Sequence, residues 1–217
     1  MSEGRPLSLR EHCWTFLYGL REAARYLGGR MNVVRHPYER WAAVRLPDSV
    51  QSVLFVCKGN ICRSPLAEAY LRSLVEKDGR SMTVRSAGLE TTPGKPADDR
   101  VKAVAWEHRL LLDRHATTQV HMELLDQSDL IIVMEIGQRD RIQALYPKAK
   151  GKVVLLGRFD SSIGPLEIAD PYSGTTEDFL SCFQQVSRCC DMLAARLGMK
   201  DSKPSTNQVL PVDPKIT

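Results

Sequence analysis

The stretch Val53–Pro65, with the sequence VLFVCKGNICRSP, joins a run of large apolar residues to a loop of small and reactive ones. Its first four residues predict a buried β-strand over Val53–Val56. The residues after the loop, Pro65–Lys77, carry apolar side chains at helical spacing and predict an α-helix. A strand that leads through a short glycine-containing loop into a helix is an arrangement that binds anions in α/β proteins.

The same alternation of short apolar runs and amphipathic segments continues along the chain and predicts a parallel α/β sheet. One run, Leu130–Met134, is uninterrupted and mostly β-branched, as in strands that are buried on both faces. Further strands are predicted at Met82–Arg85 and Lys152–Leu156, and helices at Ala97–His108, Thr118–Asp126, Ile136–Tyr146 and Glu177–Leu197.

The two ends of the chain differ from this pattern. Residues 1–50 contain an amphipathic stripe that begins at the capping-box sequence Ser8–Glu11 and ends at Gly28–Gly29, which predicts a partly helical extension. Residues 201–217 contain three prolines and few large apolar side chains, which predicts a disordered tail. We therefore expect three parts, with the α/β domain in residues 51–200.

Composition and charge exclude several classes of protein. The net charge of +4 is too weak and too scattered over 217 residues to favour nucleic acid as a partner. No window approaches about 18 uninterrupted apolar residues, and the first ten residues have no apolar core of a signal peptide. The six cysteines follow no regular disulfide spacing. We therefore expect a cytoplasmic protein whose cysteines are either reactive or simply buried.

The loop has the chemistry needed to bind a phosphate dianion beside a nucleophile. Gly59 permits backbone turns that point successive N–H groups inward, next to the positive end of the helix. The planar guanidinium of Arg63 matches two phosphate oxygens, and Ser64-Pro65 predicts the N-cap and first residue of the helix. Cys57 lies at the mouth of this positive loop, where a thiolate is stabilised and acts as a nucleophile.

Two structural alternatives to a nucleophile are open. Cys57 could be a buried cysteine in an ordinary strand-to-helix turn, and Cys57 with Cys62 could bind zinc. The zinc site is the weaker alternative, because no second pair of ligands accompanies the two cysteines. The first alternative requires Gly59, Asn60 and Ser64 to fall beside Cys57 and Arg63 by chance, which is very improbable for a motif of this length.

The sequence VCKGNICRSP resembles the signature of the low-molecular-weight protein tyrosine phosphatases, over about residues 52–197. That family has a four-stranded parallel sheet with helices on both faces and forms a phosphocysteine intermediate. Residues 134–135, 151–157 and 167–172 are most similar to its bacterial branch, whose members act on tyrosine autokinases that control exopolysaccharide export. Further matches, in the family's order, are Arg85–Gly88, His115 with Gln119, Asp129–Met134 and Asp170–Tyr172.

The resemblance implies the catalytic roles. Cys57 attacks phosphorus, while Arg63 and the loop amides hold the phosphate oxygens. Asp170, whose loop Pro171 stiffens, protonates the leaving phenolate and then activates water. No metal and no other cofactor is expected, because the guanidinium and the amides already neutralise the phosphate. The residues expected to bind the substrate are Lys58, Gly59, Asn60, Ile61, Cys62, Ser64 and Tyr172.

The resemblance also implies supporting roles, with alternatives. Ser64 donates a hydrogen bond to the departing Cys57 sulfur, and Asn60, Ser86 and His115 join Ser64 in a network that fixes the loop. His115 could instead be an ordinary surface histidine, and Tyr172 could be a packed turn residue. Cys62 is either a buried filler or the partner of Cys57 in a reversible disulfide. The remaining cysteines of the last helix, expected in the core or on the surface, are Cys182, Cys189 and Cys190.

Three activities share this kind of loop, and the residues favour phosphotyrosine hydrolysis. Arsenate reductases need further cysteines after the third strand, and Ile132–Gln138 contains none. Phosphoarginine phosphatases tend to have threonine after the loop asparagine, where this chain has Ile61. The segment Leu89–Pro93 lacks the aromatic residue of the family's vertebrate members, and only one tyrosine, Tyr172, follows Asp170-Pro171, so a more open pocket is expected.

Non-enzymatic functions explain the residues less well. A phosphoprotein-binding module that has lost turnover should lack the nucleophile or the acid, and this chain keeps both. A thiol redox sensor built on Cys57 and Cys62 would leave Asp170 without a role. For residues 1–50, we expect the amphipathic helix to dock on the catalytic domain or on a second subunit. The alternative is that its basic face lies on a membrane or shields the active site.

Overall fold

The computed structural model describes residues 44–160 and 166–200. The chain divides into two units, Met1–Ala42 and Ala43–Thr217, and the described residues belong to the second. The amphipathic helix expected between Ser8 and Gly28 and the disordered tail expected at 201–217 lie outside the described residues. The described structure is therefore that of the α/β domain.

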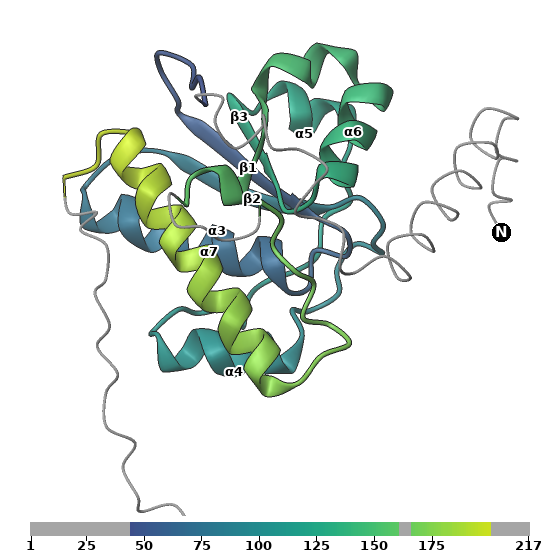
Figure 1. Ribbon diagram of the computed structural model, residues 1–217, viewed down its shortest axis with the longest axis vertical. Coiled ribbons are helices and arrows are strands. Elements are labelled where there is room, and N and C mark those ends of the chain that lie inside the picture. Colours follow the sequence, from purple (N-terminus) through teal and green to yellow (C-terminus); the bar gives the residue numbers. More distant parts are fainter. Residues whose placement is uncertain (1–43, 161–165, 201–217) are drawn as a thin grey trace, which may run out of the picture. The chain divides into compact units, whose positions relative to one another are not determined.

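Four parallel strands form one sheet, as the sequence predicted, in the order β2-β1-β3-β4 (Figure 1). The two central strands are β1 and β3, and all of their residues except the first of β1 are buried. Their uninterrupted apolar sequences suit this position, since helices cover both faces of a parallel sheet. The strands are β1, Ser52–Cys57; β2, Thr83–Gly88; β3, Leu130–Val133; and β4, Val153–Leu155.

Helices cover the sheet on both faces (Figure 1). Alternate residues of β1 point to opposite sides, so Val53 and Phe55 join one apolar cluster, whereas Leu54 and Val56 join another. The first cluster includes residues of α3 (Arg63–Lys77), α4 (Asp99–Glu107) and α7 (Thr176–Arg196). The second includes residues of α5 (Met122–Asp126) and α6 (Ile136–Leu145). The short 3-10 helices are η1, Pro147–Lys152, and η2, Leu156–Arg158.

The start of α3 differs from the prediction. The helix begins at Arg63 with Cys62 as its N-cap, so the expectation that Ser64 caps it and Pro65 is its first residue is wrong. The reason is the use made of the Ser64 hydroxyl, which contacts the Cys57 sulfur at 3.0 Å and accepts a hydrogen bond from Asn60 Nδ2 at 2.9 Å. A side chain engaged with the loop is unable to cap its own helix.

Two other boundaries move because neighbouring segments pair. Strand β2 continues past Arg85 to Gly88, since Gly88 lies in register with Cys57 of β1. Helix α5 begins at Met122 rather than Thr118, because the backbone of Thr118 and Val120 bonds to Gly88 on either side. The longer β2 and the non-helical segment before α5 both bring backbone to the carboxyl end of β1. The strand order reverses beside β1, and in open α/β sheets this is the place where ligands bind.

Candidate active site

The sulfur of Cys57 lies at the carboxyl end of β1 and is held by two groups of the following loop. The Asn60 amide donates a hydrogen bond to Sγ at 3.2 Å, and the Ser64 hydroxyl contacts Sγ at 3.0 Å. Cys57 is buried, although its backbone stands at the mouth of a loop. Donors directed at a sulfur stabilise its thiolate, so the loop supplies what a cysteine nucleophile needs.

Asn60 fixes the shape of this loop from its centre. It is fully buried and has a φ of 54°, in the left-handed region that Asn tolerates better than most residues. Its Nδ2 donates to the hydroxyls of Ser64 and Ser86, both at 2.9 Å, and its Oδ1 accepts from the Thr118 amide at 2.8 Å. Its carbonyl oxygen lies 2.8 Å from Nε2 of His115. The residues expected in a supporting network, Ser86 and His115, thus both contact Asn60.

The loop packs against a glycine that had no assigned role in the sequence. A Cβ atom at Gly88 would lie 2.9 Å from the Lys58 carbonyl oxygen and 3.0 Å from the Asn60 nitrogen. Only glycine permits so close an approach of two backbones. Gly88 therefore lets the end of β2 pack directly against the loop. The amides of the next residues, Leu89 and Glu90, donate hydrogen bonds to the carbonyls of Cys57 and Lys58.

The guanidinium of Arg63 is 1% exposed and is held along one edge. NH1 donates to Glu135 Oε1 at 2.6 Å and to the Ile168 carbonyl at 3.0 Å, while NH2 donates to Asp170 Oδ2 at 2.6 Å. Burial by itself would lower the pKa of Arg63, but the negative charges of Cys57, Asp170 and Glu135 outweigh it and raise that pKa. Arg63 therefore carries a permanent positive charge inside the domain.

Several donors of the loop have no protein partner. The Nε atom of Arg63 is buried and makes no hydrogen bond within the described ranges. The backbone N–H groups of Ile61, Cys62 and Arg63 likewise have no hydrogen-bond acceptor in this part of the chain. A buried donor such as Arg63 Nε costs free energy unless a ligand satisfies it. Together with the positive end of α3, these donors make a site for a compact anion with several oxygens.

Asp170 reaches the site from the segment before α7. The Ile168 amide donates to the Met134 carbonyl at 2.9 Å, which anchors this segment to the end of β3. The Asp170 side chain is 40% exposed and pairs with Arg63 through Oδ2, while Oδ1 accepts from the Tyr172 amide at 3.3 Å. The Asp170 carboxylate and the Cys57 thiol are more than 100 residues apart in the sequence, yet the charges of both raise the pKa of Arg63.

This constellation matches a known family. The model of the low molecular weight phosphotyrosine protein phosphatases matches residues 52–203. The chain belongs to this family. It is therefore a protein tyrosine phosphatase by descent, and the resemblance found in its sequence is confirmed.

Relatives and solved structures similar to the chain are tyrosine phosphatases and an arginine phosphatase. The chain is 37% identical over 147 residues to the low molecular weight protein-tyrosine-phosphatase Wzb of Escherichia coli K12, covering 68% of this chain and 95% of Wzb. The tyrosine phosphatase Wzb of Escherichia coli K30, in complex with sulphate, is 35% identical with a TM-score of 0.64, over 69% and 100% of the two chains. The YwlE arginine phosphatase of Geobacillus stearothermophilus is 32% identical with a TM-score of 0.62, over 68% and 93%.

Two residues of the phosphatase site were missed in the sequence. Glu135 orients Arg63, and no local pattern distinguishes it from an ordinary acidic residue at a helix start. Arg100 pairs with both carboxylate oxygens of Asp98, at 3.0 and 2.9 Å, and donates to the Tyr172 carbonyl at 2.9 Å. Its guanidinium carbon also lies 4.5 Å from the centre of the Phe179 ring. The contacts of Glu135 with Arg63 and of Arg100 with Tyr172 and Phe179 are long-range, so only the fold reveals them.

The rim and the other cysteines of the phosphatase are also placed. Tyr172 lies in a turn and is 55% exposed, with the Arg100 guanidinium carbon 5.7 Å from the centre of its ring, and its contact with the substrate stays a prediction. Cys62 is a buried free thiol, and burial, followed by the charges of Asp98 and Asp170, raises its pKa. Burial raises the pKa of Cys182 to about 12, as expected for a core thiol. The two remaining cysteines of α7, Cys189 and Cys190, are likewise buried.

Two findings concern other kinds of site. Within residues 44–160 and 166–200, no group of three or more His, Cys, Asp or Glu side chains could hold a metal ion. Among the helices of the same residues, none is both long enough and apolar enough to cross a membrane.

Proposed function

We propose that this phosphatase hydrolyses phosphotyrosine in proteins through a phosphocysteine intermediate, with Cys57 as nucleophile, Arg63 as phosphate ligand and Asp170 as general acid and base. The observation that carries the proposal is the arrangement around Arg63. Glu135 and the Ile168 carbonyl hold NH1, whereas Nε has no partner in the described residues. The edge formed by Nε and NH2 is thus directed to bind two oxygens of one phosphate.

Phosphate binding would also release the Asp170 side chain from its ion pair with Arg63. The dianion competes with Asp170 for NH2 of Arg63, to which Asp170 is bonded at 2.6 Å. Once a phosphate occupies that edge, the Asp170 carboxyl group is separated from the guanidinium and faces the substrate's leaving oxygen. The Asp170 carboxylate, no longer paired with the guanidinium and close to the phosphate charge, takes up a proton from solvent. It thereby becomes the proton donor, which is the role that the family resemblance gives to Asp170.

The reaction then runs in two displacements. The Cys57 thiolate forms a bond to phosphorus while the bond from phosphorus to the phenolic oxygen breaks, and Asp170 gives its proton to that oxygen. Asp170 next takes a proton from water, the water oxygen bonds to phosphorus, and the sulfur leaves as a thiolate. The Asn60 amide and the Ser64 hydroxyl stabilise the departing sulfur. Arg63 and the loop amides hold the remaining phosphate oxygens in both steps.

The proposed substrate is a phosphotyrosine protein, in particular a tyrosine autokinase of polysaccharide export. Similarity to Wzb supports this, and so do the half-buried Ile61 beside the loop and the exposed ring of Tyr172. We place the enzyme in the cytoplasm as part of the same proposal. The five cysteines of the described residues are free thiols, which suits a reducing compartment.

Two peptides of the same sequence, one with phosphotyrosine and one with phosphoarginine, test the substrate class. We expect kcat/KM to be at least about a hundredfold higher for phosphotyrosine, because the Ile61 side chain packs against an aromatic ring better than against a guanidinium. Release of inorganic phosphate measures both reactions. The control variant Ile61→Thr should lower the ratio of kcat/KM for the phosphotyrosine peptide to kcat/KM for the phosphoarginine peptide. Faster hydrolysis of the phosphoarginine peptide by the unaltered enzyme would refute the tyrosine assignment.

Arg100 is expected to position the segment that carries the acid. The variant Arg100→Gln loses the bonds to Asp98 and to the Tyr172 carbonyl, so Asp170 becomes less well placed beside the leaving group. We expect kcat for phenyl phosphate to fall about tenfold, and kcat for p-nitrophenyl phosphate, whose leaving group needs little protonation, to change much less. The matched control is Arg188→Gln on α7. Equal losses on both substrates would show that Arg100 has only a structural role.

A further inference from the structure

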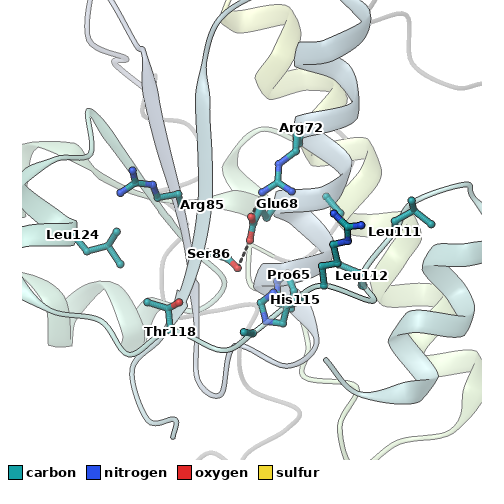
Figure 2. A pocket seen from close by; sticks show the side chains of 13 residues that line it. Pro65, Glu68, Arg72, Arg85, Ser86, Leu111, Leu112, His115, Thr118 and Leu124 are labelled. Atoms are coloured by element: carbon teal, nitrogen blue, oxygen red, sulfur yellow. Dashed lines mark hydrogen bonds and ion pairs between the residues drawn. The ribbon is translucent and has the colours of Figure 1, made fainter. Parts of the chain in front are cut away.

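A cavity distinct from the Cys57 site lies between α3, β2 and the segment 111–118 (Figure 2). Its volume is about 350 Å³, within the range of small-molecule sites. None of Cys57, Arg63 and Asp170 lines it. Its polar wall consists of Glu68, Arg72, Arg85, Ser86, Arg114, His115 and Thr118.

Positive charge outweighs negative charge in this cavity. Three arginines face one carboxylate, that of Glu68, which Arg72 and the Ser86 hydroxyl already share. Figure 2 shows Glu68 between these two partners. Arg85 donates to the neutral amide oxygen of Gln127 at 3.1 Å, and Arg114 makes no hydrogen bond or ion pair with the described residues. Two guanidinium charges therefore lack a carboxylate, which favours an anionic ligand.

The rest of the lining is apolar. Leu112 and Leu124 are buried side chains of the wall, and Leu111 is 68% exposed. An inorganic ion would leave these surfaces in water, whereas an aryl or alkyl group would cover them. The combination of unpaired guanidinium groups and an apolar wall specifies a ligand with one acidic group on an apolar body.

We infer that this cavity binds a small organic anion, a phosphate, sulfonate or carboxylate on an apolar body, and that the bound anion slows the phosphatase. The acidic group pairs with Arg114 and draws Arg72 away from Glu68, while Arg85, on the opposite face of β2, adds positive charge at the other end of the cavity. The binding half of the inference stands by itself, and the effect on turnover rests on the proposed function.

A chain of contacts connects the cavity to the nucleophile. The Ser86 hydroxyl donates to Glu68 and accepts from Asn60 Nδ2 at 2.9 Å, and the Asn60 amide donates to the Cys57 sulfur at 3.2 Å. Asn60 has the left-handed φ of 54°, a conformation that persists because its surroundings hold it. When Arg72 no longer pairs with Glu68, the strength of the hydrogen bond from the Ser86 hydroxyl to the Glu68 carboxylate changes. The contact of Ser86 with Asn60, which supports the loop after Cys57, changes with it. The expected effect is a lower kcat with an unchanged KM.

Anilinonaphthalene sulfonate is the probe, because its fluorescence rises when its rings leave water. Orthovanadate at saturation occupies the phosphate loop, so that any sulfonate bound there is displaced. We expect saturable binding that persists with orthovanadate and that weakens at least about tenfold in the double variant Arg85→Gln/Arg114→Gln. Arg188→Gln, which removes the same charge from a residue that does not line the cavity, should bind the probe normally. The neutral parent phenylnaphthylamine should bind poorly.

The outcomes separate this inference from the proposed function. Loss of the signal with orthovanadate, or equal affinity in the double variant and in Arg188→Gln, would place the probe elsewhere and overturn the inference. Binding as expected without any effect on kcat would overturn the regulatory half. Failure of the enzyme to hydrolyse phosphotyrosine would leave the fluorescence result unaffected. Circular dichroism of the double variant verifies that weakened binding does not reflect unfolding.

Discussion

Replacement of Cys57 by serine is expected to lower kcat for p-nitrophenyl phosphate by at least about 10⁴-fold, the scale seen when an enzyme loses its nucleophile. A serine hydroxyl is a weak nucleophile at neutral pH without a base to activate it, whereas the loop stabilises a thiolate. Binding of inorganic phosphate should survive, since Arg63 and the loop amides are unchanged. Steady-state kinetics and titration calorimetry measure the two quantities.

The control for this variant is Cys182→Ser, which makes the same chemical change in the core of α7. The Cys182 thiol has a pKa of about 12 and no place in the proposed reaction, so turnover by the folded variant should be close to normal. If Cys57→Ser kept a tenth or more of the kcat, a different nucleophile would have to be sought. Loss of phosphate binding together with turnover would instead indicate that the loop had collapsed.

Replacement of Asp170 by asparagine is the second large effect. We expect kcat for phenyl phosphate to fall by about 10² to 10³-fold, because the leaving oxygen departs without a proton. The loss for p-nitrophenyl phosphate should be smaller, since that leaving group is stable as an anion. The KM should stay the same or fall, because an amide no longer competes as an anion for NH2 of Arg63.

The matched control is Asp99→Asn, a change of the same kind on a side chain that is almost fully exposed in α4. Its kinetics should equal those of the unaltered enzyme for both esters. Comparable losses of kcat on the two esters in Asp170→Asn would remove the acid role, since only protonation distinguishes their leaving groups. A rise in KM alone would indicate that Asp170 binds the substrate rather than protonating it.

Much of the fold and site could be predicted because the information is local. The apolar run of β1, the loop after it and the helix α3 adjoin in the sequence, so Cys57, Gly59 and Arg63 could be read together. Asp170 has no such local context, and only the family resemblance pointed to it. Its segment reaches the loop through backbone pairing of Ile168 with Met134, which no periodicity reveals.

The errors and omissions share a physical cause, which is competition from tertiary contacts. Ser64 has the local chemistry of an N-cap, but Cys57 and Asn60 engage its hydroxyl, so the helix begins earlier, at Arg63. Thr118 was assigned to a helix, but its backbone pairs with Gly88. Glu135 and Arg100 act on groups that are distant in the sequence, and single-residue patterns contain no sign of such partners.

The most direct test of the account is to detect phosphate on the Cys57 sulfur. The Asp170→Asn enzyme lacks the base for the second displacement, so the intermediate should accumulate with p-nitrophenyl phosphate. After rapid acid quench and digestion, mass spectrometry should find one phosphoryl group on the peptide that contains Cys57, in an amount equal to the burst of p-nitrophenol. A burst with no phosphate on Cys57, or with phosphate on another residue, would contradict the phosphocysteine mechanism.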